Sequence, residues 1–287
     1  MHHVMVRGIE KRKIVDDGRD GQAFVGRLGE VARATGTAIY AWSLMSNHAH
    51  ILLRSGSQGL PTFMRRLLTG YAMDYNRRHR RHGHLFQNRY KSIICEEDPY
   101  VRELVRYIHL NPLRAGLVKD LKELDRYRWC GHSVLLGRVK CEWQDRSFVL
   151  GWFGRRESKA VAEYRQYVEQ GVPLGRRPEL VGGGLVRSLG GWSAVKSRRQ
   201  KGERVISDER VLGDGEFVAR VLEEAEERIR HQLPSEQRMH EAMTLVERVC
   251  KDRDISREEL GSGSRRGPVA QARALLAERL VRELGIA

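Results

Sequence analysis

The sequence contains no apolar run of about 18 residues, the length that a transmembrane helix requires. Its first residues, MHHVMVRGIEKRK, also lack the apolar segment of a secretory signal. The four cysteines match neither a C-x-x-C zinc pattern nor a disulfide framework, so we assign them no role. These absences favour a protein of the reducing cytoplasm that has no membrane partner.

Acidic residues are comparatively scarce: 37 Asp and Glu stand against 52 Lys and Arg, for a formal net charge of +15. Such an excess favours a polyanionic partner, and without a membrane element nucleic acid is the expected one. A basic surface without a specific partner is the alternative. The length of 287 residues and the hydrophobic content of 40% suffice for a sizeable core and more than one domain.

Hydrophobic periodicity predicts the element order β-α-β-β-α-β-α in the first part of the chain. The expected segments are a strand at 3–8, a helix from the N-cap Asp17 to Gly36, strands at 37–45 and 48–55, a helix at 60–83, a strand at 85–97 and a helix at 98–112. This order predicts an α+β fold, a ferredoxin-like split β-α-β domain with an antiparallel sheet. Helices would cover one face and leave the other free for function.

The remainder of the chain is expected to divide in two. Short helices and loops rich in Gly and Arg, such as LGRRPELVGGGLVRSLGG and KSRRQKGER, indicate an extension and linker. A second helical block begins at about 206, and Ser256 with Glu259 forms a capping box within it. The predicted domains are therefore 1–120, 121–205 and an α-helical C-terminal domain at 206–287.

Two histidines stand out in LMSNHAHILL, residues 44–53. Residues two apart on a strand point the same way, so His48 and His50 project together from one face. Neutral imidazoles side by side can bind a divalent metal ion. A pair of partly exposed histidines without a metal explains the pattern equally well.

The segment VRYIHLNP adds a second set of side chains. Tyr107 and Asn111 are four residues apart and share a helix face. Asn111 precedes Pro112 and should end the helix, where its amide oxygen can turn toward a metal ion. A tyrosine beside such an ion is a plausible nucleophile, because a cation helps the phenol ionise. Taken alone, Tyr107 could equally be a core aromatic residue.

Together, SLMSNHAHILL, GHLFQNRYKS and YVRELVRYIHLNPLRAGLV resemble the single-tyrosine HUH transposases, specifically their REP-associated branch. YRWCGHSVLLG and FVLGWFG resemble the segment that follows the catalytic domain in long members, so the resemblance spans roughly residues 2–170. It implies cleavage and rejoining of single-stranded DNA at hairpins through a 5′-phosphotyrosine. It also implies Tyr107 as the nucleophile, His48, His50 and Asn111 as metal ligands, and Mg²⁺ or Mn²⁺ as the metal.

Other tyrosines compete with Tyr107 as the nucleophile, but only Tyr107 stands in a Tyr-x-x-x-Asn-Pro context. The competitors are Tyr71, Tyr75, Tyr90 and Tyr100. The basic stretch RRHRRHGHLFQNRYK, residues 77–91, interleaves cations with Phe86 and Tyr90, which suits a groove for single-stranded DNA. A solvated helix end is the alternative. Its candidate DNA contacts are Arg77, Arg78, Arg80, Arg81, Arg89 and Lys91.

The segment ISREELGSGSRRGPVAQARALLAERLVRELGI resembles the helix-turn-helix domain of the bacterial replication initiator. Arg265 and Arg266 in its loop would then contact phosphates. The recognition helix of that domain would follow Ala287, so we expect a truncated module. The abrupt beginning inside the first strand likewise suggests that an upstream segment is missing.

Three hypotheses follow from these patterns, and none of them fixes an oligomeric state. The leading one is a metal-dependent tyrosine transposase that acts on single-stranded, hairpin-containing DNA. The second is a non-catalytic DNA-binding regulator or domesticated transposase relic. The third is a metal-dependent nuclease in which water attacks the phosphate and Tyr107 only packs.

Overall fold

The computed structural model describes residues 1–87, 90–175, 177, 180, 208, 210–232, 236–262 and 266–284. The chain divides into two compact units, Met1–Ala219 and Arg220–Ala287, which are described separately. No helix in the described part of the chain is both long and apolar enough to cross a membrane.

The first unit contains a five-stranded sheet with the order β2-β3-β1-β4-β5. Its strands are β1 (His2–Arg7), β2 (Ala38–Leu44), β3 (His48–Arg54), β4 (Lys91–Cys95) and β5 (Val211–Leu212). The first four pair antiparallel in the order of a ferredoxin-like fold, which confirms the predicted fold class. The short β5 was not predicted; it pairs with β4 in parallel.

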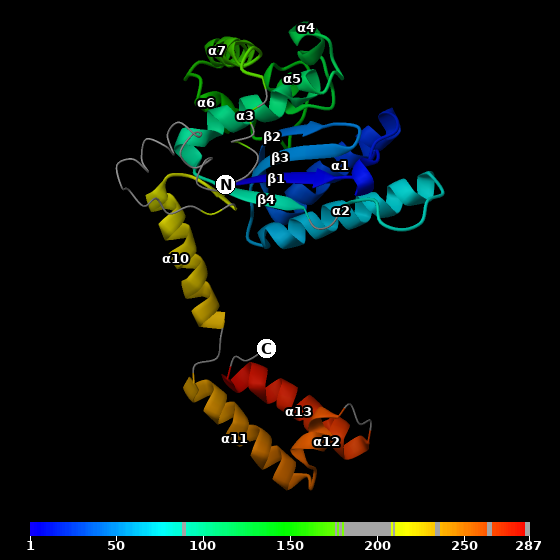
Figure 1. Cartoon of the computed structure of the whole chain (residues 1–287), viewed down its shortest axis with the longest axis vertical. Helices are drawn as coiled ribbons and strands as arrows, with labels where there is room; N and C mark the ends of the chain where they lie inside the picture. The colour runs from blue at the N-terminus through cyan, green and yellow to red at the C-terminus, as the bar shows by residue number, and fades with distance from the viewer. Residues whose placement is uncertain are drawn as a thin grey trace. The chain divides into compact units, whose positions relative to one another are not determined.

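Helices cover both faces of this sheet (Figure 1). One face is covered by α1 (Gly18–Thr35) and α2 (Gly59–Arg78), the other by α3 (Glu97–Arg114) and the shorter helices α4 (Leu121–Leu124), α5 (Gly131–Leu135), α6 (Arg146–Gly151) and α7 (Glu157–Gln170). The expectation of a free second face was wrong. The apolar side of α3, including Val105 and Ile108, needs burial and finds it against Leu52 and Ile93 of the sheet.

Several boundaries follow from local chemistry. Asp17 caps α1 by accepting from the backbone N–H groups of Arg19 and Asp20, and Gly36 ends it with a positive φ of 63°, both as predicted. The next helix, α2, ends at Arg78 rather than near 83, because Arg80 adopts a left-handed φ of 49°. The strand predicted at 85–97 is limited to Lys91–Cys95, the part that finds partners on β1.

The end of α3 also differs from the prediction. The helix continues through Pro112 to Arg114. Pro112 has no backbone N–H, so the helix loses only the one hydrogen bond to the preceding turn. Leu113 follows it and packs against the core between the sheet and α3. Asn111 therefore lies inside the last turns of the helix rather than at its end.

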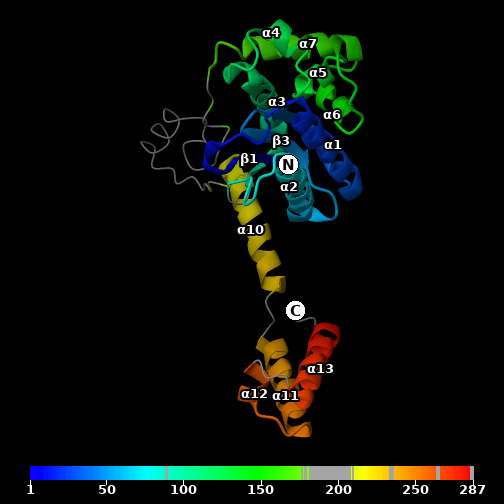
Figure 2. The same cartoon turned by 90° about the vertical axis from the view of Figure 1, so that its right-hand side faces the viewer.

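The described helices beyond β5 are α10 (Gly215–Gln232), α11 (Glu236–Asp252), α12 (Arg257–Gly261) and α13 (Gly267–Leu284). In the second unit, Figure 2 shows α11, α12 and α13 together, and Leu245, Val249, Ala272 and Leu276 form their small core. Ser256 caps α12 by accepting from the N–H of Glu259, as predicted.

Candidate metal-binding and nucleophile site

The hairpin of β2 and β3 positions both histidines of the motif. In the sheet, His50 lies opposite Met5 of β1 and Ser43 of β2. The His48 and His50 rings lie edge to face with centroids 5.3 Å apart, so the two side chains share a face as the spacing predicted. His50 is buried and His48 half-buried.

Helix α3 brings Tyr107 to these histidines. The Tyr107 ring lies 5.8 Å from the His50 ring, centroid to centroid, in an edge-on arrangement. The Arg114 guanidinium carbon lies 5.5 Å from the centre of the same tyrosine ring. The structure therefore brings together the two candidate ligands and the candidate nucleophile, from a strand and a helix far apart in the sequence.

Asn111 follows Tyr107 by one helical turn. Its side-chain Nδ2 is buried and has no hydrogen-bond partner. The nitrogen and oxygen of a carboxamide are assigned from their surroundings, and a half-turn of the group exchanges them. In the exchanged orientation, the buried position holds a carbonyl oxygen, which is a suitable ligand for a hard cation.

A third histidine, which the sequence patterns did not single out, completes this group. His3 of β1 is fully buried, and its ring lies 6.0 Å from Tyr107 and stacks 5.2 Å from His50, centroid to centroid. Its Nε2 is 3.0 Å from His50 Nδ1, and its Nδ1 is 3.2 Å from the Leu180 carbonyl oxygen. We call this group the His50 site: His3, His48, His50, Tyr107 and Asn111.

Burial keeps the imidazoles of the His50 site neutral. Desolvation lowers the pKa of His3 to about 4, with an opposing contribution from the Leu180 carbonyl. It also lowers the pKa of His48 to about 4 and that of His50 well below its usual value, each with a contribution from Arg7. Neutral imidazoles retain a lone pair, so the donors of this site fit a divalent cation.

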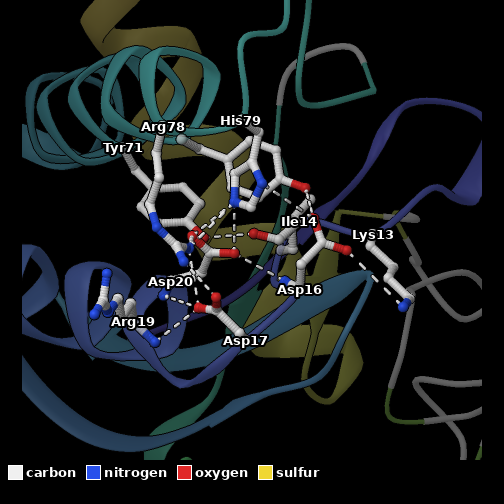
Figure 3. Close-up of polar contacts among 10 residues, drawn as sticks. Lys13, Ile14, Asp16, Asp17, Arg19, Asp20, Tyr71, Arg78 and His79 are labelled. Atoms are coloured by element: carbon white, nitrogen blue, oxygen red, sulfur yellow. Dashed lines mark hydrogen bonds and ion pairs between the residues drawn. The ribbon is translucent and has the colours of Figure 1, made fainter.

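A separate polar cluster joins the start of α1 to the end of α2 (Figure 3). The buried carboxylate of Asp20 accepts from Arg78, from His79 Nε2 at 2.9 Å and from the Asp16 N–H at 2.9 Å. Tyr75 donates to Asp16, and Arg78 also pairs with Asp17. We call this group the Asp20 cluster: Asp16, Asp17, Asp20, Tyr75, Arg78 and His79.

Ligand atoms of Asp16, Asp20 and His79 lie within 4.8 Å of one another, which would allow a metal ion. However, the Arg78 guanidinium already neutralises Asp20. Burial alone would raise the pKa of Asp20, but the Asp16 N–H, His79 and Arg78 together lower it. The cluster thus has its own cation beside its carboxylates.

The candidate DNA contacts of residues 77–91 have different surroundings. Arg77, Arg80 and Lys91 are exposed, whereas Arg78 belongs to the Asp20 cluster. Arg81 lies over the Tyr75 ring at 5.8 Å. Arg89 falls outside the described residues.

The aromatic residues of the same stretch face inward rather than forming an open stacking surface. Phe86 and Tyr90 are partly buried against the core between the sheet and helices α1 and α2. In the second unit, Arg266 is exposed and pairs with Glu259, and Arg265 falls outside the described residues.

Comparison with known proteins agrees with this geometry. Residues 1–111 match the model of the family described as "Transposase IS200 like". No curated protein matches the chain.

Two solved structures are similar to this chain. A REP-associated tyrosine transposase bound to a REP hairpin is 15% identical, with a TM-score of 0.40, over 50% of this chain and 90% of that one. A candidate transposase from Deinococcus radiodurans R1 is 18% identical, with a TM-score of 0.30, over 37% of this chain and 84% of that one. The family match covers β1 to α3 and includes every residue of the His50 site.

Proposed function

We propose that this chain cleaves and rejoins single-stranded DNA next to hairpins through a covalent bond to Tyr107. One observation carries the proposal: the rings of His48, His50 and Tyr107 form a contact series between β3 and α3. A water-using nuclease would not need a tyrosine beside its metal ligands, and a DNA-binding regulator would need neither.

In the proposed reaction, the Tyr107 oxygen attacks the phosphorus of a phosphodiester and loses its proton. The bond from phosphorus to the 3′ oxygen breaks, and that oxygen takes up a proton to become a free 3′-hydroxyl. The 5′-phosphate stays on Tyr107 as a phosphodiester. A second 3′-hydroxyl then reverses the step, so rejoining needs no external energy source.

His48, His50 and Asn111 would hold Mg²⁺ or Mn²⁺, and such an ion would polarise the phosphate and stabilise its developing charge. The protein's own part is to fix the ring of Tyr107 against His50. The Arg114 guanidinium also lies over the face of the Tyr107 ring, in a cation–π contact.

DNA recognition is proposed for four cations between the last turn of α2 and the start of β4: the exposed Arg77, Arg80 and Lys91, and the half-buried Arg81. Arg78, Arg89, Arg265 and Arg266 remain proposed phosphate contacts. The first of these would have to exchange its carboxylate partners for a phosphate.

The test is incubation with labelled single strands that flank a hairpin, with Mn²⁺ and with EDTA, followed by denaturing electrophoresis. The wild-type protein should form a covalent protein–DNA adduct only with the metal. Tyr107→Phe should form none yet still bind DNA. Tyr100→Phe, on the same helix, is the matched control and should keep the adduct.

Two results would contradict the proposal. An adduct formed by Tyr107→Phe would assign the nucleophile to another tyrosine. Cleavage of duplex and single strands alike, with no attached protein, would favour the water-using nuclease.

A further inference from the structure

We infer that His3 is a positioning residue that fixes the proton of His50 on Nδ1 and leaves Nε2 free to bind a metal ion. The inference rests on the proposed function, since it concerns a ligand of the same site. It adds a residue from β1 and a backbone carbonyl at position 180 to the machinery of residues 48–111.

The direction of the hydrogen bonds follows from their last acceptor. A carbonyl oxygen only accepts, so the His3 Nδ1 that faces the Leu180 oxygen at 3.2 Å carries the hydrogen. His3 is fully buried and has no carboxylate among its hydrogen-bond partners in the described part of the chain, so it is neutral. Its Nε2 is therefore unprotonated and accepts.

The next bond is then determined. His50 Nδ1, 3.0 Å from His3 Nε2, must be the donor. A neutral imidazole has a single ring proton, so the Nε2 of His50 carries none. Without such a partner, imidazole in water favours the opposite tautomer, with its proton on Nε2, which would block that nitrogen as a ligand.

His48 reaches the same state by a local route. Asn47 donates from Nδ2 to the Lys11 carbonyl at 3.1 Å, which fixes its Oδ1 as an acceptor. His48 Nδ1, 2.6 Å from that oxygen, therefore donates to it. Both candidate ligands thus expose Nε2, and the hydrogen bond that orients each one comes from outside the metal-binding atoms.

The register of the sheet makes His3 available for this role. His3 lies opposite Leu52, and Met5 opposite His50, so His3 and His50 are diagonal neighbours on one face. The adjacent His2 points to the other face and contacts Ser92 through its Nδ1 at 3.2 Å. His2 therefore offers a matched control one residue away.

The test compares three variants in the metal-free protein and with Mn²⁺ alone. Nitrogen-15 NMR of the imidazoles reports the His50 tautomer, and calorimetric titration reports Mn²⁺ affinity. His3→Phe keeps a ring but no acceptor: His50 should shift toward the Nε2–H form, and Mn²⁺ should bind about 10- to 100-fold more weakly.

The other two variants are controls. His3→Gln places a carbonyl oxygen near the position of Nε2, so it should keep the wild-type tautomer and most of the affinity. His2→Phe should change neither. If His3→Phe proves unstable, the NMR test of the His50 tautomer is made with His3→Asn instead. The inference predicts that this variant loses the His50 Nδ1–H signal.

The inference is overturned if His50 already carries its proton on Nε2 in the wild-type protein, or if His3→Phe alters neither tautomer nor Mn²⁺ affinity. Because the NMR readout needs no DNA, it is separate from the proposed reaction. A wild-type protein that forms no DNA adduct but shows the His3-dependent tautomer would refute the transposition chemistry and leave the role of His3 intact.

Discussion

The Asp20 cluster and the His50 site both combine histidine and tyrosine in the same unit, yet they differ in how their hydrogen-bonding capacity is used. In the Asp20 cluster, three carboxylates meet Arg78, His79, Tyr75 and backbone N–H groups, so each carboxylate has hydrogen-bond donors (Figure 3). In the His50 site, the imidazoles are neutral, and the buried Nδ2 of Asn111 has no hydrogen-bond partner.

The two groups differ as a structural cluster differs from a candidate binding site. A buried group that has all its partners stabilises the fold, and removing one leaves the others unsatisfied. Lone pairs and an unpaired amide in a buried position contribute little to stability, which indicates another reason for their presence. Mutations in the two groups should therefore affect different measurements.

The largest effect should follow replacement of both His48 and His50 by alanine. Cleavage of the labelled strand should fall by at least about 100-fold, because the metal is no longer held at the phosphate. DNA binding should persist, and its steep weakening with salt should be unchanged. His79→Ala is the control, with cleavage retained. Full cleavage by the double variant would remove the His50 site from the mechanism.

Asp20→Ala should instead affect stability. It leaves Arg78 with one carboxylate and His79 without its closest one, at a cost of about 1–3 kcal/mol in the free energy of unfolding. Urea denaturation measures this loss, and Asp17→Ala, at the exposed edge of the cluster, should lose less. An Asp20→Ala protein of native stability that no longer cleaves DNA would reverse the roles of the two groups.

The two groups should also lose their contributions to stability in different pH ranges. His3 and His48 have their pKa lowered from 6.5 to about 4, so between those values the unfolded chain binds protons that the folded chain does not. Stability therefore falls as the pH drops from about 6.5 to about 4. Hydrogen bonding from Arg78 lowers the pKa of Asp17 from 3.8 to about 2. Asp17 therefore contributes to a second fall in stability as the pH drops between those two values.

Urea titrations across pH check this prediction. Burial also lowers the pKa of His2, His109 and His132, so the comparison is between variant and wild type. The His48 and His50 double variant should show a shallower fall in the upper range alone, and Asp17→Asn in the lower range alone. If the free energy of unfolding falls equally steeply in the upper pH range for the wild type and the double variant, the attribution of that fall to His48 and His50 is contradicted.

The smallest effects concern DNA binding by two adjacent arginines. Arg77 is exposed, and its replacement by alanine should lower the salt slope of binding by about one with little change in stability. Arg78→Ala should lower stability more and DNA binding less, because its guanidinium is held by Asp17 and Asp20. Equal losses of DNA binding at both positions would show that Arg78 leaves the cluster for phosphate.

Local signals made much of the fold predictable. Asp17 and Gly36 define α1 by side-chain and backbone chemistry that neighbouring residues do not change. The ferredoxin-like order followed from alternating periodicity. Two helix ends were predicted wrongly. Helix α3 continues past Pro112, and the partly buried Leu113 packs against the core there. Helix α2 ends before the basic stretch does, because Arg80 adopts a left-handed φ.

The candidate site divides in the same way. The spacing of His48 and His50, and of Tyr107 and Asn111, predicted shared faces that depend only on strand and helix geometry. His3 escaped notice because the adjacent His2 and His3 point to opposite faces of a strand, which matches no ligand spacing. The pairing of β1 with β3 would have placed it beside His50, since alternation fixes its face. The Leu180 carbonyl could not be foreseen, because any residue supplies one.

The Leu180 carbonyl also affects when the His50 site can form during synthesis of the chain. His3 and Leu180 are separated by 177 positions, so β1 leaves the ribosome long before its partner is synthesised. At about 5–20 residues per second, the delay is on the order of 10 s or more. Until then, nothing holds the proton of His3 on Nδ1, and His50 is free to take either tautomer. Under the proposed function, a nascent chain would acquire a fully arranged metal site only after its extension has been made, which would disfavour DNA cleavage by incomplete molecules still attached to the ribosome.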